Sequence, residues 1–195
     1  NNFEIRNSFN SRDLNKKNIL IFGYGRIGKK VADICNFFNM NVFVFDKFLN
    51  LKNLSNNIKI VNNINENLNI YDFISLHIPF NNSEKALIDK TFLDKLKNDC
   101  SIINTSRGDL INEKDLINHL IKNNNFYAGL DVFNPEPPSS NNQLFQLNNT
   151  ILTPHSAAYT NECLAEMSLH CAINIENFFK GNIDQSRLIN KEIYS

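Results

Sequence analysis

The sequence has no excess of charge of either sign. Its 195 residues carry 20 lysines and arginines against 20 aspartates and glutamates, which gives a formal net charge of +0. Without a basic excess we do not expect nucleic acid as a partner, and without an acidic tail we do not expect a charged one. The longest apolar runs are far shorter than the roughly 20 residues that a membrane-spanning helix needs, so no membrane partner is expected either.

Paired cysteines, a secretory leader and an initial Met are also missing. The cysteines are Cys35, Cys100, Cys163 and Cys171, and none of them forms a C-x-x-C pair. We therefore expect neither a disulfide framework nor a metal site. Free buried thiols are typical of a reducing compartment, which predicts a cytoplasmic location. Because the chain begins Asn1-Asn2, we expect it to be a fragment of a longer protein.

Short apolar runs alternate with amphipathic segments along the chain. The runs predict strands at 18–22, 41–45, 58–61, 72–77, 100–104, 127–132 and 150–152. They are almost continuously apolar, as is typical of strands buried on both faces. The segments between them predict helices at 27–38, 90–96 and 113–123, with Asp89 and Asn112 as N-caps, and a last helix at 161–179 that closes at Gly181. This alternation predicts an α/β fold, a doubly wound and mainly parallel sheet with helices on both faces.

The first predicted strand runs directly into a glycine motif, Gly23-Tyr24-Gly25-Arg26-Ile27-Gly28, which opens a helix. Gly23 permits a tight turn, Gly25 lets the backbone approach a pyrophosphate, and Gly28 lets helix and strand pack closely. The free N–H groups at the start of the helix, around Arg26 and Ile27, can then bind the phosphates. The motif in this context predicts a dinucleotide site.

Asp46 ends the second predicted strand, roughly 20 residues beyond the glycine motif, where a dinucleotide-binding fold places an acidic residue. A carboxylate there accepts hydrogen bonds from the ribose hydroxyls and repels a 2′-phosphate, which predicts NAD rather than NADP as the cofactor. Lys47 follows directly and is the residue that could instead hold a phosphate.

Three later segments, 104–111, 129–138 and 152–160, each leave a predicted strand at its carboxyl end. Ligands of an open α/β sheet bind beyond these ends. We therefore expect Arg107, Glu136 and His155 to converge beside the cofactor.

With these segments in order, the sequence from about residue 13 to 181 resembles the NAD-dependent D-isomer-specific 2-hydroxyacid dehydrogenases, the family that includes phosphoglycerate dehydrogenase. The resemblance implies hydride transfer between NAD(H) and a 2-hydroxy acid or 2-keto acid, with Arg107, Glu136 and His155 as the catalytic set. Arg107 offers a forked donor for the substrate carboxylate and the C2 oxygen. His155 can exchange the hydroxyl proton, and Glu136 can orient its imidazole.

The resemblance also implies further cofactor contacts and a homodimer through this domain. Asp131 corresponds to the residue that holds the nicotinamide carboxamide, and Pro79 to one that borders the cofactor pocket. The remaining expected contacts are His77, Thr105, Ser106, His155 and Ala157. For His77, which lies in a strand, a structural role is the stronger interpretation. Ala157 stands where many members have a glycine, and its small side chain should preserve the nicotinamide pocket.

The predicted organisation is an NAD-binding domain at 13–182, flanked by a lead-in from a substrate domain at 1–12 and a return segment at 183–195. We expect most of the substrate domain to lie outside this chain, and we therefore expect little activity from the chain alone. Two alternatives remain, namely an NAD-sensing binding module of the corepressor type and a formate-type dehydrogenase. Glycerate, phosphoglycerate, lactate and longer hydroxy acids all stay open as substrates.

Overall fold

The computed structural model describes residues 12–49, 54, 57–81, 85–185, 188–190 and 192. The chain divides into two units, one up to His155 and one from Ser156 onward, and each is described by itself. The predicted lead-in at 1–12 lies outside the described residues apart from Arg12, and so does part of the predicted return segment at 183–195. The domain boundaries at 13–182 stay a prediction.

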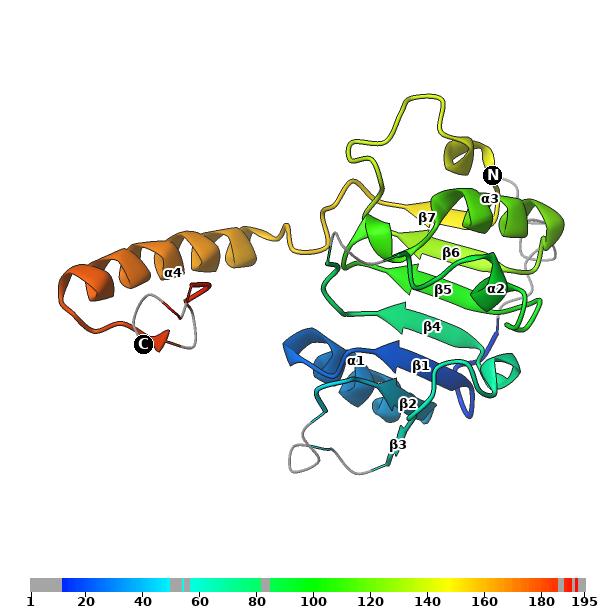
Figure 1. Ribbon diagram of the computed structural model, residues 1–195, viewed down its shortest axis with the longest axis horizontal. Coiled ribbons are helices and arrows are strands. Elements are labelled where there is room, and N and C mark those ends of the chain that lie inside the picture. Colours follow the sequence, from blue (N-terminus) through cyan, green and yellow to red (C-terminus); the bar gives the residue numbers. More distant parts are fainter. Residues whose placement is uncertain are drawn as a thin grey trace, which may run out of the picture. The chain divides into compact units, whose positions relative to one another are not determined.

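A seven-stranded parallel sheet forms the centre of the first unit (Figure 1), with the strands in the order β3-β2-β1-β4-β5-β6-β7. The strands are β1 Asn18–Phe22, β2 Asn41–Phe45, β3 Ile58–Ile60, β4 Phe73–Leu76, β5 Ser101–Asn104, β6 Tyr127–Leu130 and β7 Thr150–Leu152. Every predicted strand is confirmed, four of them one or two residues shorter than predicted. From β1, the strands β2 and β3 are added on one side of the sheet. The chain then returns to the other side of β1, where β4 to β7 follow in order, as in a doubly wound fold.

Three α-helices connect these strands, α1 Arg26–Phe37, α2 Lys90–Leu93 and α3 Glu113–Lys122, together with short 3₁₀ turns η3 Leu68–Ile70, η4 Gly108–Leu110 and η5 Gln143–Gln146. The predicted caps are confirmed, because Asp89 accepts a hydrogen bond from the Phe92 backbone N at 2.9 Å and Asn112 from the Asp115 backbone N at 3.1 Å. The prediction of a helix over 90–96 was too long. From Lys95 onward the hydrogen bonds run from residue i to i−3, which tightens the chain into turns.

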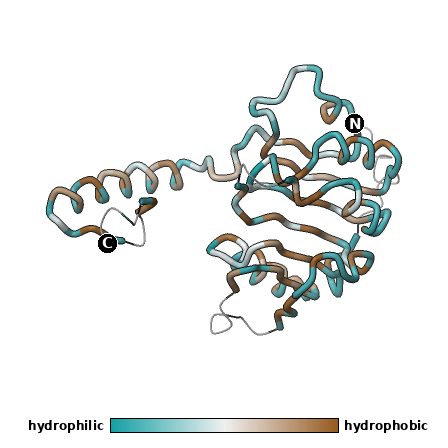
Figure 2. The backbone as a smooth tube through the Cα atoms, viewed as in Figure 1, coloured by the Kyte–Doolittle hydropathy of each residue, from teal (hydrophilic) through white to brown (hydrophobic). Residues whose placement is uncertain are grey.

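The central strands β1 and β4 are largely buried on both faces, which explains why their sequences are mostly apolar. Along β1, Leu20 and Phe22 join the cluster that packs against α2 and α3, whereas Ile19 and Ile21 join a second cluster with Ala32 and Cys35 of α1. The hydrophobic colour in Figure 2 accordingly follows the strands. Successive residues of a strand point to opposite faces, so only a strand covered on both sides can be apolar at each position.

The second unit contains one long helix, α4, Asn161–Phe179, which matches the predicted range. The Thr160 side chain caps its start by accepting a hydrogen bond from the Cys163 backbone N at 3.1 Å. Gly181, with φ of 74°, follows its end as predicted, and Asn182 N donates back to Asn177 O at 2.8 Å. None of the helices in the described part of the chain combines the length and the apolar character needed to cross a bilayer.

Asp72 joins the starts of two central strands. Its Oδ2 accepts a hydrogen bond from the Asn18 backbone N at 2.8 Å, and its Oδ1 lies 2.8 Å from Lys97 Nζ. Partial burial by itself would raise the pKa of Asp72, but the hydrogen bonds from Lys97 and Asn18 outweigh burial and hold that pKa below its ordinary value. The ionised carboxylate therefore stabilises the folded state.

Replacing Asp72 by Asn should lower the free energy of unfolding at pH 7 by about 1–3 kcal/mol, the order expected for a hydrogen bond to a charged group. Because the folded-state pKa is lowered, this contribution is complete above the pKa of about 3.9 of an unfolded Asp and is lost as the pH falls through the folded-state value. Urea unfolding of both proteins across this pH range measures the difference.

The matched control is Asp99→Asn, which removes only an exposed ion pair with Arg12. Exposed pairs contribute about 0–1 kcal/mol, so the control should change stability little. If the difference in free energy of unfolding between the wild type and Asp72→Asn stayed constant from neutral to strongly acidic pH, the role given to the ionised carboxylate would be contradicted.

Candidate active site

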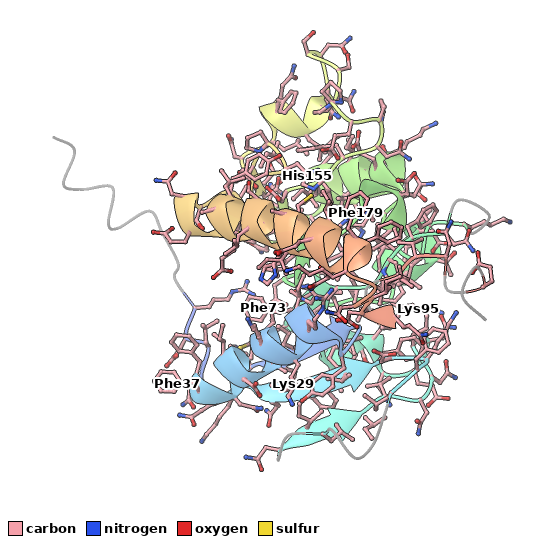
Figure 3. All side chains as sticks on the ribbon, turned by 90° about the vertical axis from the view of Figure 1, so that its left-hand side faces the viewer. Lys29, Phe37, Phe73, Lys95, His155 and Phe179 are labelled. Atoms are coloured by element: carbon pink, nitrogen blue, oxygen red, sulfur yellow. The ribbon has the colours of Figure 1, made fainter. Side chains whose placement is uncertain are left out.

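The predicted site residues of the first unit gather at one edge of the sheet. Because all strands are parallel, the loops after β1, β2, β4, β5, β6 and β7 leave from the same side, and the strand arrows in Figure 1 point toward it. Figure 3 views the molecule from this side, with His155 labelled. Open parallel sheets bind their ligands beyond this edge.

The glycine loop after β1 has the geometry that its sequence predicts. Gly23 has φ of 88°, and a Cβ on it would lie 2.5 Å from His77 O. A Cβ on Gly28 would lie 1.9 Å from Gly23 O, so no side chain fits there. At Gly25, by contrast, a Cβ would have nothing within 4 Å, and no side chain makes a capping hydrogen bond at this start of α1. The space beside Gly25 thus lies open at the start of α1, and the backbone N–H groups of a helix start fit the pyrophosphate of a dinucleotide.

Asp46 stands beside this loop, at the carboxyl end of β2. Its Oδ2 accepts a hydrogen bond from Tyr24 N and its Oδ1 accepts one from Phe48 N, both at 2.7 Å. The carboxylate is thus fixed in place by the glycine loop itself, a second role that the sequence analysis missed. An ionised carboxylate has about four acceptor positions, so positions remain for the two ribose hydroxyls.

The loop after β5 is shaped by Asn104, a buried residue that sequence reasoning did not single out. Its Nδ2 donates to Arg107 O at 2.8 Å, and its Oδ1 accepts from Ser106 N at 3.1 Å and from Ser106 Oγ at 2.9 Å. Only 1% of Asn104 is exposed. The available signal was a polar residue at the end of a buried apolar strand. Arg107 itself is exposed, as is Thr105, and its Nη1 donates to Ser106 O at 2.6 Å.

Asp131 lies at the end of β6, where it is only 3% exposed. Its Oδ1 accepts a hydrogen bond from Thr153 Oγ1 at 2.6 Å, and its backbone N donates to Asn104 O at 2.9 Å. Thr153 directly follows β7, so this bond links the ends of neighbouring strands. A carboxylate held so firmly is suited to position a carboxamide.

Glu136 and His155 lie together, although they are far apart in the sequence. Glu136 Oε1 is 2.5 Å from His155 Nδ1, and the two side chains are 38% and 52% exposed. They border an apolar cavity of about 270 Å³, which is also lined by Phe133, Pro137, Phe145 and Pro154 among others. The pairing leaves the second imidazole nitrogen, Nε2, for a ligand, the arrangement expected of a general acid and base with an orienting carboxylate.

The contacts of His77 fit the structural role that the sequence favours for it. It follows β4, its backbone N donates to Phe22 O at 2.8 Å, and its Nε2 lies 2.8 Å from Ser75 Oγ. Burial lowers the pKa of the His77 imidazole. Its carbonyl lines the glycine turn, and Pro79 is exposed two residues further along the chain.

Arg26 and Ile27 are exposed in the first turn of α1, where their backbone N–H groups belong to the start of the helix. Ala157 belongs to the second unit, and the cofactor contact expected for it stays a prediction.

Comparison with known proteins agrees with this geometry. The model of the family described as D-isomer specific 2-hydroxyacid dehydrogenase, NAD binding domain, matches residues 1–157. A hydroxypyruvate reductase of Blautia hydrogenotrophica is 34% identical over 170 residues, which are 87% of this chain and 52% of that protein. The NAD-complexed structure of a D-isomer specific 2-hydroxyacid dehydrogenase from Lactobacillus delbrueckii ssp. bulgaricus matches with a TM-score of 0.82 at 25% identity, over 92% of this chain and 58% of that one.

A further solved structure extends the range of chemistry among the relatives. An acyclic imino acid reductase in complex with NADPH and D-Arg matches with a TM-score of 0.76 at 31% identity, over 92% of this chain and 59% of that one. The chain spans about half the length of the hydroxypyruvate reductase, or 52%. Since the family match covers most of the chain, the protein belongs to the D-isomer specific 2-hydroxyacid dehydrogenases and represents their NAD-binding domain.

Proposed function

We propose that this chain is the cofactor-binding half of an oxidoreductase that interconverts a 2-keto acid and a 2-hydroxy acid, with Arg107, Glu136 and His155 as the catalytic set. The observation that carries the proposal is the Glu136–His155 pair at 2.5 Å. The pair stands at the sheet edge where the glycine loop and Asp46 would hold NAD. The names of the relatives support the same reaction class.

In the reducing direction, NADH held by the glycine loop and Asp46 would supply the hydride for C2 of the keto acid. His155 donates a proton from Nε2 to the C2 oxygen, which becomes the hydroxyl group of the product. Glu136 accepts a hydrogen bond from Nδ1, which fixes the imidazole orientation. Arg107 holds the substrate carboxylate through its planar fork. In the oxidising direction His155 takes the proton back.

The short distance between Glu136 and His155 also bears on the alternatives. A formate-type dehydrogenase releases no hydroxyl proton, so it has no need of a carboxylate partner for its histidine. A binding module of the corepressor type needs no proton transfer at all. We therefore favour proton-coupled turnover, and the relative named hydroxypyruvate reductase makes hydroxypyruvate the first keto acid to assay. The homodimer and the cytoplasmic location stay predictions from the sequence.

The protein should bind NADH more tightly than NADPH, because the 2′-phosphate of NADPH would face the Asp46 carboxylate. Asp46→Asn keeps an oxygen that can accept the Tyr24 N–H but removes the charge, so it should shrink the preference by about tenfold. Fluorescence titration with both nucleotides measures this preference as the ratio of the NADPH and NADH dissociation constants. The control Asp94→Asn removes a carboxylate that pairs with Lys90 on α2 and should leave the ratio unchanged. Equal or tighter NADPH binding by the wild type would point instead to Lys47 as a phosphate ligand.

His155→Ala in the intact enzyme should lower kcat on the order of 10²–10⁴-fold, the usual contribution of a general acid or base. NADH affinity should fall much less than kcat, because the proton transfer acts on the substrate, whereas the expected contact of His155 with the cofactor is one among several. Steady-state kinetics and nucleotide titration separate the two effects. His170→Ala, a change of the same type on α4, serves as the control and should leave both quantities unchanged. An unaltered kcat for His155→Ala would refute the catalytic role.

The chain of residues 1–195 alone should bind NADH yet turn over slowly. The predicted nucleotide site is present in it, but Arg107 is exposed, and water weakens its attraction for a carboxylate. The substrate would also lose most of its positioning, normally a large share of the rate enhancement. The test is to assay reduction of several 2-keto acids after NADH binding has been shown. Turnover as fast as that of the intact enzyme would show that this chain completes its own substrate site.

A further inference from the structure

The loops that carry Arg107 and Glu136 touch each other without room for a side chain between them. A Cβ on Gly108 would lie 2.0 Å from Phe133 O and 2.1 Å from the Phe133 carbonyl carbon. Gly108 is not among the glycines with positive φ, so its backbone conformation does not require glycine. The close approach of the second loop explains the residue instead.

The residues next to this approach are joined by a side-chain hydrogen bond. Asn134 Nδ2 donates to Asp109 Oδ1 at 2.5 Å, across 25 positions of sequence. Together, the Gly108–Phe133 approach and the Asp109–Asn134 bond form what we call the loop contact. It lies one residue after Arg107 and begins three residues before Glu136. The loop contact is therefore close in sequence to both catalytic side chains, Arg107 and Glu136.

The loop contact is attached to rigid parts of the fold on both sides. On the β5 side, Asn104 is buried and holds the Arg107 carbonyl. On the β6 side, Phe133 is only 6% exposed and belongs to the main core cluster. Arg107 and Glu136 themselves are exposed, so packing around their own side chains does little to fix where they stand.

We propose that the loop contact fixes the distance between Arg107 and the Glu136–His155 pair, which makes Asp109 and Asn134 positioning residues for the reaction. This inference rests on the proposed function. Arg107 would hold the carboxylate of the substrate while His155 protonates the oxygen at C2, one bond away. Both groups must therefore keep one fixed separation. A displacement of about 1 Å in such a site can cost on the order of 100-fold in rate.

The experiment compares three variants of the intact enzyme. Asp109→Ala and Asn134→Ala each break the bond, whereas Asp109→Asn keeps a carbonyl oxygen in the acceptor position. The matched control is Glu113→Ala. It breaks another amide–carboxylate bond to the loop after β6, from Asn142 Nδ2 to Glu113 Oε1 at 2.8 Å, which touches neither Arg107 nor Glu136.

The two alanine variants should lower kcat/KM for the 2-keto acid by roughly 10- to 100-fold while the NADH dissociation constant stays within about twofold. Combining them should cost no more than either alone, because they remove the same bond. Asp109→Asn should recover most of the activity, and Glu113→Ala should retain it. Additive losses, or an equal loss in Glu113→Ala, would overturn the proposal.

Hydrogen exchange gives a readout that does not depend on turnover. The backbone amides of residues 105–109, 133, 134 and 136 should exchange faster in Asn134→Ala than in the wild type, and not in Glu113→Ala. Unchanged exchange in Asn134→Ala would refute the loop contact. If exchange responds while the wild type reduces no 2-keto acid, the loop contact stands as a structural feature, but the proposed function fails and the positioning role fails with it.

Discussion

The whole arrangement depends on the parallel register of the sheet. Parallel strands cannot be joined by tight turns, so each connection must cross a face of the sheet and return, and every strand then ends at the same edge. In this chain that edge collects the glycine loop, Asp46, Arg107, Asp131 and the Glu136–His155 pair from segments more than a hundred residues apart. The reversal of strand order beside β1 places the glycine loop where the two halves of the sheet diverge.

Buried polar side chains hold this edge and the opposite one. Asn104 and Asp131 act at the carboxyl ends of β5 and β6, where their hydrogen bonds tie loops to strands. At the other end, Asn149 is 8% exposed and donates from Nδ2 to the carbonyls of Leu120 and Phe126. A buried amide without partners would be costly, so such residues persist where they satisfy several backbone groups at once. They fix where loops begin while leaving the loop tips open to ligands.

The strands and the glycine loop could be predicted from the sequence because their causes are local. A strand buried on both faces must be apolar at each position, the tight turn demands glycine at position 23, and close packing against that turn demands glycine at position 28. The convergence of Glu136 and His155 was expected from the carboxyl ends of their strands, and their pairing from the resemblance to the dehydrogenase family. The end of α2, the second role of Asp46 and the approach of Gly108 to Phe133 escaped prediction. Each depends on which backbone happens to lie nearby, and no pattern along the chain records that.

This division between local and non-local causes bears on how the site can work. The atoms that would grip the cofactor are mostly backbone groups of a loop whose shape glycine and Asp46 fix. The side chains that would act on the substrate, by contrast, are exposed and stand on loops, where their own packing does not determine their separation. Catalysis depends on that separation more steeply than binding does. A protein built this way must fix its substrate-facing groups through contacts between loops, and the Gly108–Phe133 approach, with no room for even a methyl group, is one such contact.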